Sequence, residues 1–278
     1  MMYSIYHFFA KLIHERAQLT DDRNLEQLPF LTDSMFFSCH SIGIFPDRAI
    51  RLQPLPLLYR GGELLEFKDS KGYSVSSFNS TLPTGKKPID AFIGTKIQQQ
   101  MEAAGENILS LPMRDVFYLI RGREQKRTEK AHVKVCLLHG SFFETIPIQQ
   151  LIQETFAQIL QEGMGDQLSA AEKDRLAALL TTHQIFNRVC LIPGASVNPG
   201  FRVMAGVTVE GNILKTTQYP QIAHDTLNLI LPFYSPEEEE QHLTLTQMAL
   251  EDNFGEVIMK YIKHPLNGWF IVFQCPLN

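Results

Sequence analysis

Three short segments of this 278-residue chain carry side chains that could act together on a negatively charged substrate. Tyr59-Arg60 ends a short apolar run, Phe78 is followed by Ser80-Thr81, and Glu106 stands just before another apolar run. A guanidinium can hold a phosphate through two parallel hydrogen bonds, and a carboxylate can stabilise positive charge that develops in a transition state. The residue types therefore indicate a site that binds an anion and catalyses the cleavage of a bond close to it.

This order resembles the Arg, Ser-Thr, Glu pattern of mono-ADP-ribosyltransferases, some of which are bacterial effectors or toxins. The resemblance implies that NAD is the cofactor and that Arg60, with Tyr59 beside it, anchors its phosphate and ribose. The segment with Phe78 and Ser80-Thr81 would brace the nicotinamide side. Glu106 would be the catalytic residue and would hold the ribose 2′-hydroxyl, and the acceptor of ADP-ribose would be a protein or a small molecule.

Two other classes of function stay open. A non-enzymatic interaction protein, again of the effector type, would present an exposed apolar or acidic surface, such as the region 148–182 or the acidic run 237–240. A cysteine hydrolase would pair Cys39 or Cys136 with a histidine that is distant in sequence: His139, His224 or His264. Cys136 lies within an apolar strand pattern, which favours a buried and unreactive thiol.

His132, Cys136 and His139 are the residues that come nearest to a metal-binding pattern. On a strand, residues 132 and 136 share one face and residue 139 points to the other. A structural zinc ion needs four ligands around it, so this spacing does not build a zinc site. We predict no metal site from the sequence.

Charge and hydropathy limit the partners and the compartment. The chain has 30 acidic and 25 basic side chains, a formal net charge of −5, which predicts no binding to nucleic acid. The charged run from Arg121 to Lys130 is predicted to be a solvated turn. No apolar run reaches the roughly 18 residues of a membrane span, and the first residues lack a signal-peptide cleavage site. A cytoplasmic protein is expected, or one delivered into another cell without a cleavable signal peptide.

The positions of apolar residues predict helices and strands in an order typical of an α+β fold. Helices are expected at 3–13 and 97–104, as a hairpin at 148–160 and 169–180, and at 235–263 with a break at Gly255. The second helix of the hairpin starts with a capping box, Ser169-Ala170-Ala171-Glu172. Strands are expected at 108–120, as one or two strands broken near Pro112, and at 131–138, 201–209, 213–214, 227–234 and 268–275.

The predicted fold is therefore α+β, with a mostly antiparallel sheet, a helix hairpin and flanking helices. Residues 1–144 would form an irregular α+β region, and residues 145–278 would hold the helix hairpin and antiparallel strands. No flexible linker marks this boundary, so a single domain is the alternative.

Overall fold

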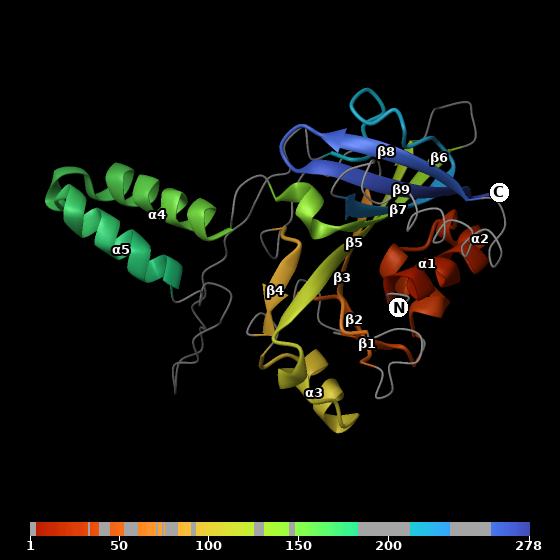
Figure 1. Cartoon of the computed structure of the whole chain (residues 1–278), viewed down its shortest axis with the longest axis horizontal. Helices are drawn as coiled ribbons and strands as arrows, with labels where there is room; N and C mark the ends of the chain where they lie inside the picture. The colour runs from red at the N-terminus through yellow and green to blue at the C-terminus, as the bar shows by residue number, and fades with distance from the viewer. Residues whose placement is uncertain are drawn as a thin grey trace.

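One mixed β-sheet organises the chain in this computed structural model (Figure 1), which describes residues 4–32, 34–38, 45–52, 61–70, 72–73, 75, 83–89, 93–124, 131–144, 148–182, 212–233 and 257–278. Within those residues, nine strands form a sheet in the order β1-β2-β3-β5-β6-β7-β9-β8, and β4 pairs with β5 beside this path. The strands are β1 (Phe36–Ser38), β2 (Arg48–Ile50), β3 (Leu64–Ser70), β4 (Lys86–Pro88), β5 (Met113–Glu124), β6 (His132–His139), β7 (Thr226–Phe233), β8 (Ile258–His264) and β9 (Gly268–Pro276).

The pairs β3 with β5 and β6 with β7 are parallel, and the other pairs among the described strands are antiparallel. This confirms the predicted α+β class with a mostly antiparallel sheet. The pair β6 and β7 also joins a strand from the region 1–144 to one from 145–278, so one sheet draws on both predicted regions.

The described helices are α1 (Ser4–His14), α2 (Arg16–Leu19), α3 (Lys96–Ala103), α4 (Ile148–Met164) and α5 (Ala170–Thr182). The predicted helices at 3–13 and 97–104 and the helix hairpin are confirmed. Ser169 and Glu172 form the expected capping box: Glu172 Oε2 accepts from Ser169 N at 2.8 Å, and Ser169 Oγ accepts from Glu172 N at 3.4 Å. In Figure 1, α4 and α5 lie side by side, apart from the sheet. None of the described helices has the length and apolar character needed to cross a membrane.

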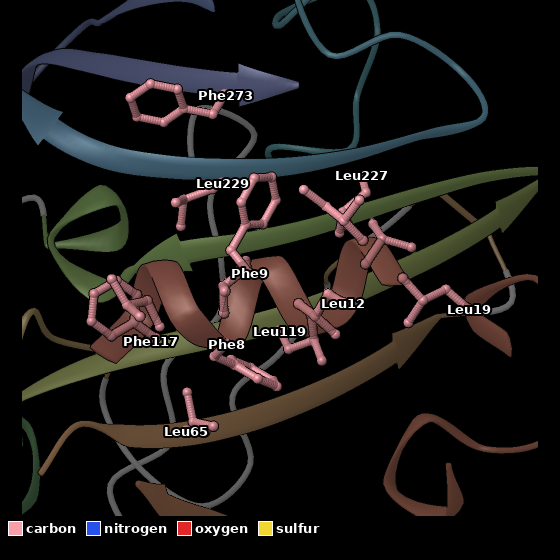
Figure 2. Packing of buried hydrophobic residues seen from close by; sticks show 14 of the residues in the cluster. Phe8, Phe9, Leu12, Leu19, Leu65, Phe117, Leu119, Leu227, Leu229 and Phe273 are labelled. Carbon is pink, nitrogen blue, oxygen red and sulfur yellow. The ribbon is translucent and has the colours of Figure 1, made fainter. Parts of the chain in front are cut away.

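Helix α1 covers one face of the sheet (Figure 2). Its apolar side chains recur every three or four residues, which puts them on one side of the helix. Phe8, Phe9 and Leu12 are fully buried there. The same apolar cluster includes residues of β3, β5, β7 and β9, namely Leu65, Phe117, Leu119, Leu227, Leu229 and Phe273.

The opposite face of the sheet carries a second apolar cluster. Alternate residues of the same strands point to it, because successive side chains of a strand face opposite ways. Tyr118, Cys136 and Ile230 belong to this cluster, together with Ile97 and Met101 of α3. The sheet is therefore covered on both faces, which explains why its central strands are apolar on both sides.

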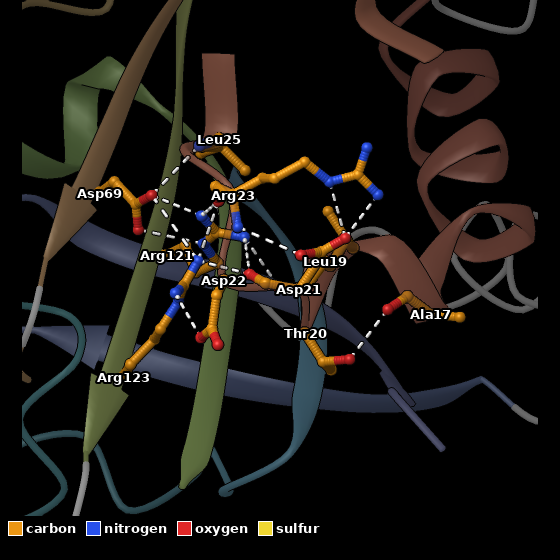
Figure 3. A network of polar contacts seen from close by, with 10 residues as sticks. All are labelled: Ala17, Leu19, Thr20, Asp21, Asp22, Arg23, Leu25, Asp69, Arg121 and Arg123. Atoms are coloured by element: carbon orange, nitrogen blue, oxygen red, sulfur yellow. Dashed lines mark hydrogen bonds and ion pairs between the residues drawn. The ribbon is translucent and has the colours of Figure 1, made fainter. Parts of the chain in front are cut away.

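Arg121 connects the segment after α2 to the sheet through hydrogen bonds and an ion pair (Figure 3). Its guanidinium is fully buried, forms a bidentate ion pair with Asp69 of β3, and donates to the carbonyl oxygens of Leu19, Asp21 and Arg23. The prediction of a solvated turn from Arg121 onward is wrong at its start, since β5 continues to Glu124. The continuation of β5 could not be recognised from the sequence, because arginine is usually a surface residue whereas Arg121 is buried.

Two other predictions need correction, and a third needs it in part. The end of the helix predicted at 235–263 is strand β8, which pairs with β9 through a three-residue turn at 265–267. Gly268, which follows the turn with φ of +79°, is the kind of residue that three-residue hairpin loops favour. The segment 213–214 is a buried turn rather than a strand. In the region predicted at 108–120, the break expected near Pro112 agrees with the start of β5 at Met113, and Ile108–Ser110 before it is a short 3-10 turn rather than a strand. The expected strand at 201–209 and residues 235–256 lie outside the described residues.

Candidate functional site

Glu106 follows α3, where the chain turns toward β5. Gly105 ends the helix with φ of +76°, and Glu106 N donates to Met101 O at 2.9 Å. This turn directs the Glu106 side chain to Leu52, whose N–H donates to Oε1 at 2.9 Å. The other carboxylate oxygen, Oε2, is buried and accepts a hydrogen bond from no described residue.

Two arginines surround this carboxylate. Burial raises the pKa of Glu106, while the Leu52 hydrogen bond and the charges of Arg114 and Arg51 oppose the rise. Arg114 is fully buried and donates to Gly62 O at 3.3 Å. The Arg51 guanidinium lies over the Phe37 ring, 4.5 Å from its centre, and its Nε is buried without an acceptor among the described residues.

The described chain leaves this neighbourhood at Leu52 and returns to it at Gly61. Gly61 has φ of +79°, and a Cβ there would lie 1.9 Å from Arg51 O, so only glycine allows the two segments to approach this closely. Of the residues predicted for the site, Glu106 is described. Tyr59, Arg60, Phe78, Ser80 and Thr81 lie outside the described residues, so whether the three segments converge stays a prediction.

Of the two thiols proposed for a cysteine hydrolase, the structure describes that of Cys136. Cys136 is fully buried in β6, and burial raises the pKa of its thiol to about 12. A thiol with this pKa is protonated at neutral pH and is a poor nucleophile. Cys39 lies outside the described residues.

His139, one of the proposed partners of the cysteine, takes part in a local structure instead. Its Nδ1 accepts from Ser141 N at 3.4 Å, lies 2.7 Å from Ser141 Oγ, and thereby caps the short 3-10 turn at Gly140–Phe143. Nε2 lies 3.6 Å from Oδ1 of Asp115. The three types match a serine hydrolase, but Ser141 stands two residues from the histidine and its N–H uses the nitrogen that a base would need.

A second group of ionisable side chains meets at the N-terminal end of β6. Its members come from segments that are far apart in the sequence. His132 begins the strand, and its Nδ1 lies 2.7 Å from Oδ2 of Asp225. His224 Nδ1 lies 2.8 Å from the hydroxyl of Tyr73, and the two imidazole rings have centres 5.1 Å apart. The sequence indicated only the histidines; Tyr73 and Asp225 carry no local signal that would have connected them.

Lys134 of β6 also belongs to this group. Its ammonium group is buried, lies 4.9 Å from the centre of the Tyr73 ring, and donates to Leu214 O at 3.2 Å and to Thr216 Oγ1 at 2.8 Å. Burial lowers the pKa of Lys134 and raises that of Tyr73. Perturbed groups that gather at an accessible place on the surface are typical of functional sites.

The exposed side of the helix pair fits the interaction-protein alternative, which stays a prediction. Ile159 of α4 and Leu176 and Leu179 of α5 are 54%, 37% and 48% exposed. Isolated apolar side chains are normal on surfaces, but three on one small helix pair are consistent with a contact surface.

Comparison of the chain with protein-family models, with curated proteins and with solved structures gives no match. In the part of the chain that the structure describes, no group of three or more His, Cys, Asp or Glu side chains is arranged to hold a metal ion. Function must therefore be argued from the geometry of the two sites.

Proposed function

We propose that the protein transfers ADP-ribose from NAD to a protein or small acceptor, with Glu106 as its catalytic carboxylate. The observation that carries the proposal is the buried Oε2, which no described residue supplies with a donor. Leaving a buried acceptor without a hydrogen bond costs about 1–3 kcal/mol, so such atoms are rare in native proteins. A ribose hydroxyl would supply the missing donor.

The surroundings of Glu106 favour an anionic ligand. Arg51 has a buried donor, Nε, without an acceptor among the described residues, and a phosphate oxygen would provide one. Arg60 directly precedes Gly61 in the chain, and Gly61 packs against Arg51, next to the Leu52 N–H that Glu106 binds. This contact supports a common site for the arginine and the glutamate of the pattern.

The chemistry assigned to Glu106 requires its ionised form. In the transfer, the bond between ribose C1′ and the nicotinamide nitrogen breaks, its electron pair leaves with nicotinamide, and a nucleophile of the acceptor forms the new bond to C1′. Positive charge develops on the ribose, and a carboxylate beside it lowers the barrier. Arg51 and Arg114 help to keep Glu106 ionised against the effect of burial.

The test is NAD binding and nicotinamide release by the purified chain, with cell lysate supplied as acceptor. Glu106→Gln keeps a carbonyl oxygen for Leu52 N–H and removes the charge, so we expect an intact fold and nicotinamide release reduced by about 100-fold or more. Arg60→Ala should weaken NAD binding. Glu102→Gln, an exposed carboxylate on α3, is the matched control and should leave both activities unchanged.

Two results would contradict the proposal. One is a wild-type chain that neither binds nor cleaves NAD in the presence of lysate. The other is nicotinamide release that persists in Glu106→Gln at the rate seen in Glu102→Gln. Either would leave the interaction-protein function as the better prediction.

A further inference from the structure

His132, which begins β6, and His224, which lies just before β7, are held in a geometry that suits a metal ion. Their ring centres are 5.1 Å apart and their planes are inclined by 51°. An imidazole nitrogen binds Zn²⁺ at about 2.0–2.1 Å, and two rings on one tetrahedral ion then have centres about 5 Å apart. The spacing of His132 and His224 agrees with that arrangement.

Each ring is oriented through Nδ1 by a residue distant in the sequence. Nδ1 of His132 donates to Asp225, and Nδ1 of His224 is bonded to the Tyr73 hydroxyl. The tautomer of each ring with its proton on Nδ1 leaves Nε2 unprotonated. Histidines that bind metals almost always use their second nitrogen in this way, with a carboxylate or another oxygen as the outer partner.

Asp225 is fixed by more than its bond to His132. Its Oδ1 accepts from Val133 N at 3.0 Å, its N–H donates to Val133 O at 2.7 Å, and its carbonyl accepts from Leu277 N at 2.9 Å. It is also a non-glycine residue with φ of +56° among the described residues, a conformation that aspartate tolerates better than most. The carboxylate therefore holds the His132 ring in one orientation.

The charges around the rings permit a cation. Asp225 and Glu124 add negative charge near His224, and Glu124 lies opposite His132 in the sheet register. Lys134 opposes a cation, but its ammonium is turned to Leu214 O and Thr216 Oγ1.

We propose that His132 and His224 bind one divalent transition-metal ion of the Zn²⁺ class through their Nε2 atoms, with Asp225 and Tyr73 as outer partners. Catalytic zinc sites have three protein ligands, one more than these two rings supply, so water or a substrate would fill the remaining positions. This is consistent with the lack of a third ligand among the described residues. The site is separate from Glu106 and does not depend on the NAD proposal.

Calorimetric titration of the full chain with Zn²⁺ at pH 7.5, after removal of metals with a chelator, tests the proposal. We expect one bound ion per wild-type chain and at least a 10-fold lower affinity in His132→Ala and in His224→Ala. Asp225→Asn, which tolerates the same backbone, and Tyr73→Phe should each lower the affinity about 10- to 100-fold. His14→Ala, an exposed histidine of α1, is the control and should bind as the wild type does.

A second measurement needs no variant. Diethyl pyrocarbonate modifies accessible imidazole nitrogen, and peptide mapping should show that Zn²⁺ protects His132 and His224 while His14 still reacts. The proposal is overturned if the wild type binds no Zn²⁺ at millimolar concentration. It is equally overturned if the double variant His132→Ala/His224→Ala binds with unchanged affinity, or if Zn²⁺ fails to protect the two rings.

Discussion

Strand β5 carries two fully buried arginines, Arg114 and Arg121, in different surroundings. Arg121 meets a carboxylate and three backbone carbonyls, and its ion pair with Asp69 is complete within the chain. Arg114 lies beside Glu106, where a buried carboxylate oxygen has no donor among the described residues. A satisfied buried network stabilises a fold, whereas a buried polar atom without a partner needs a further explanation, such as strain, a bound water or a ligand.

The difference explains the two roles that we assign. The Arg121 network joins the segment after α2 to the sheet, and the Arg121 guanidinium has an acceptor for each of its three nitrogens (Figure 3). The Glu106 neighbourhood includes an acceptor and, at Arg51, a donor that the described chain does not use. Three substitutions, taken in order of expected effect, test this distinction.

Arg121→Ala should cause the largest loss of stability. It removes the bidentate partner of Asp69 and the donor to Leu19 O, while Asp21 O and Arg23 O keep hydrogen bonds from Arg123. Breaking a buried ion pair on one side costs about 3–5 kcal/mol. Urea unfolding followed by circular dichroism measures the change. Arg121→Lys should recover little, because one ammonium cannot reproduce the planar fork of donors. A loss below about 1 kcal/mol would refute a structural role for this network.

Asp47→Asn tests a third buried charge. The hydrogen bond to this carboxylate does not offset the cost of burying its charge. Asp47 Oδ2 accepts from Phe67 N at 2.7 Å, yet burial and the nearby Glu66 raise the pKa of this carboxyl to about 7. The folded state thus binds a proton more tightly than the unfolded state, so stability falls as the pH rises from about 4 to about 7 and stays lower above it.

We expect Asp47→Asn to be more stable than the wild type at pH 8, by roughly 2–4 kcal/mol, and nearly equal to it at pH 4. Thermal melting at both pH values measures the difference between the two proteins. A difference that does not change with pH would mean that the Asp47 carboxyl titrates normally in the folded protein.

Glu106→Ala should have the smallest effect of the three. It removes the acceptor of the Leu52 N–H, and the loss of one such hydrogen bond costs about 1–2 kcal/mol. Glu106→Gln should stay close to the wild type in urea unfolding, because it keeps this bond. If both variants are equally unstable, the charge of Glu106 supports the fold, and the comparison with Arg121 loses its basis.

Part of the candidate chemistry could be predicted from sequence and part could not. Glu106 stands out by its place in the Arg, Ser-Thr, Glu order, and His132 and His224 stand out by type. The neighbours that give these residues their properties do not: Leu52 is 54 residues from Glu106, and Tyr73 is 151 residues from His224. Sequence spacing contains no information on such pairs, since the sheet order brings them together.

The sequence by itself determined the local structure: the amphipathic helix α1, the capping box of α5, the strand pattern of β6 and β7, and the burial of Cys136. These follow from residue periodicity and from bonds between near neighbours, which the chain can form wherever it lies. The tertiary structure decided that 258–264 pairs with β9 as a strand, that Arg121 is buried, and that Asp225 meets His132. Those outcomes depend on long-range pairing, whose gain in burial and hydrogen bonding overrides local preference.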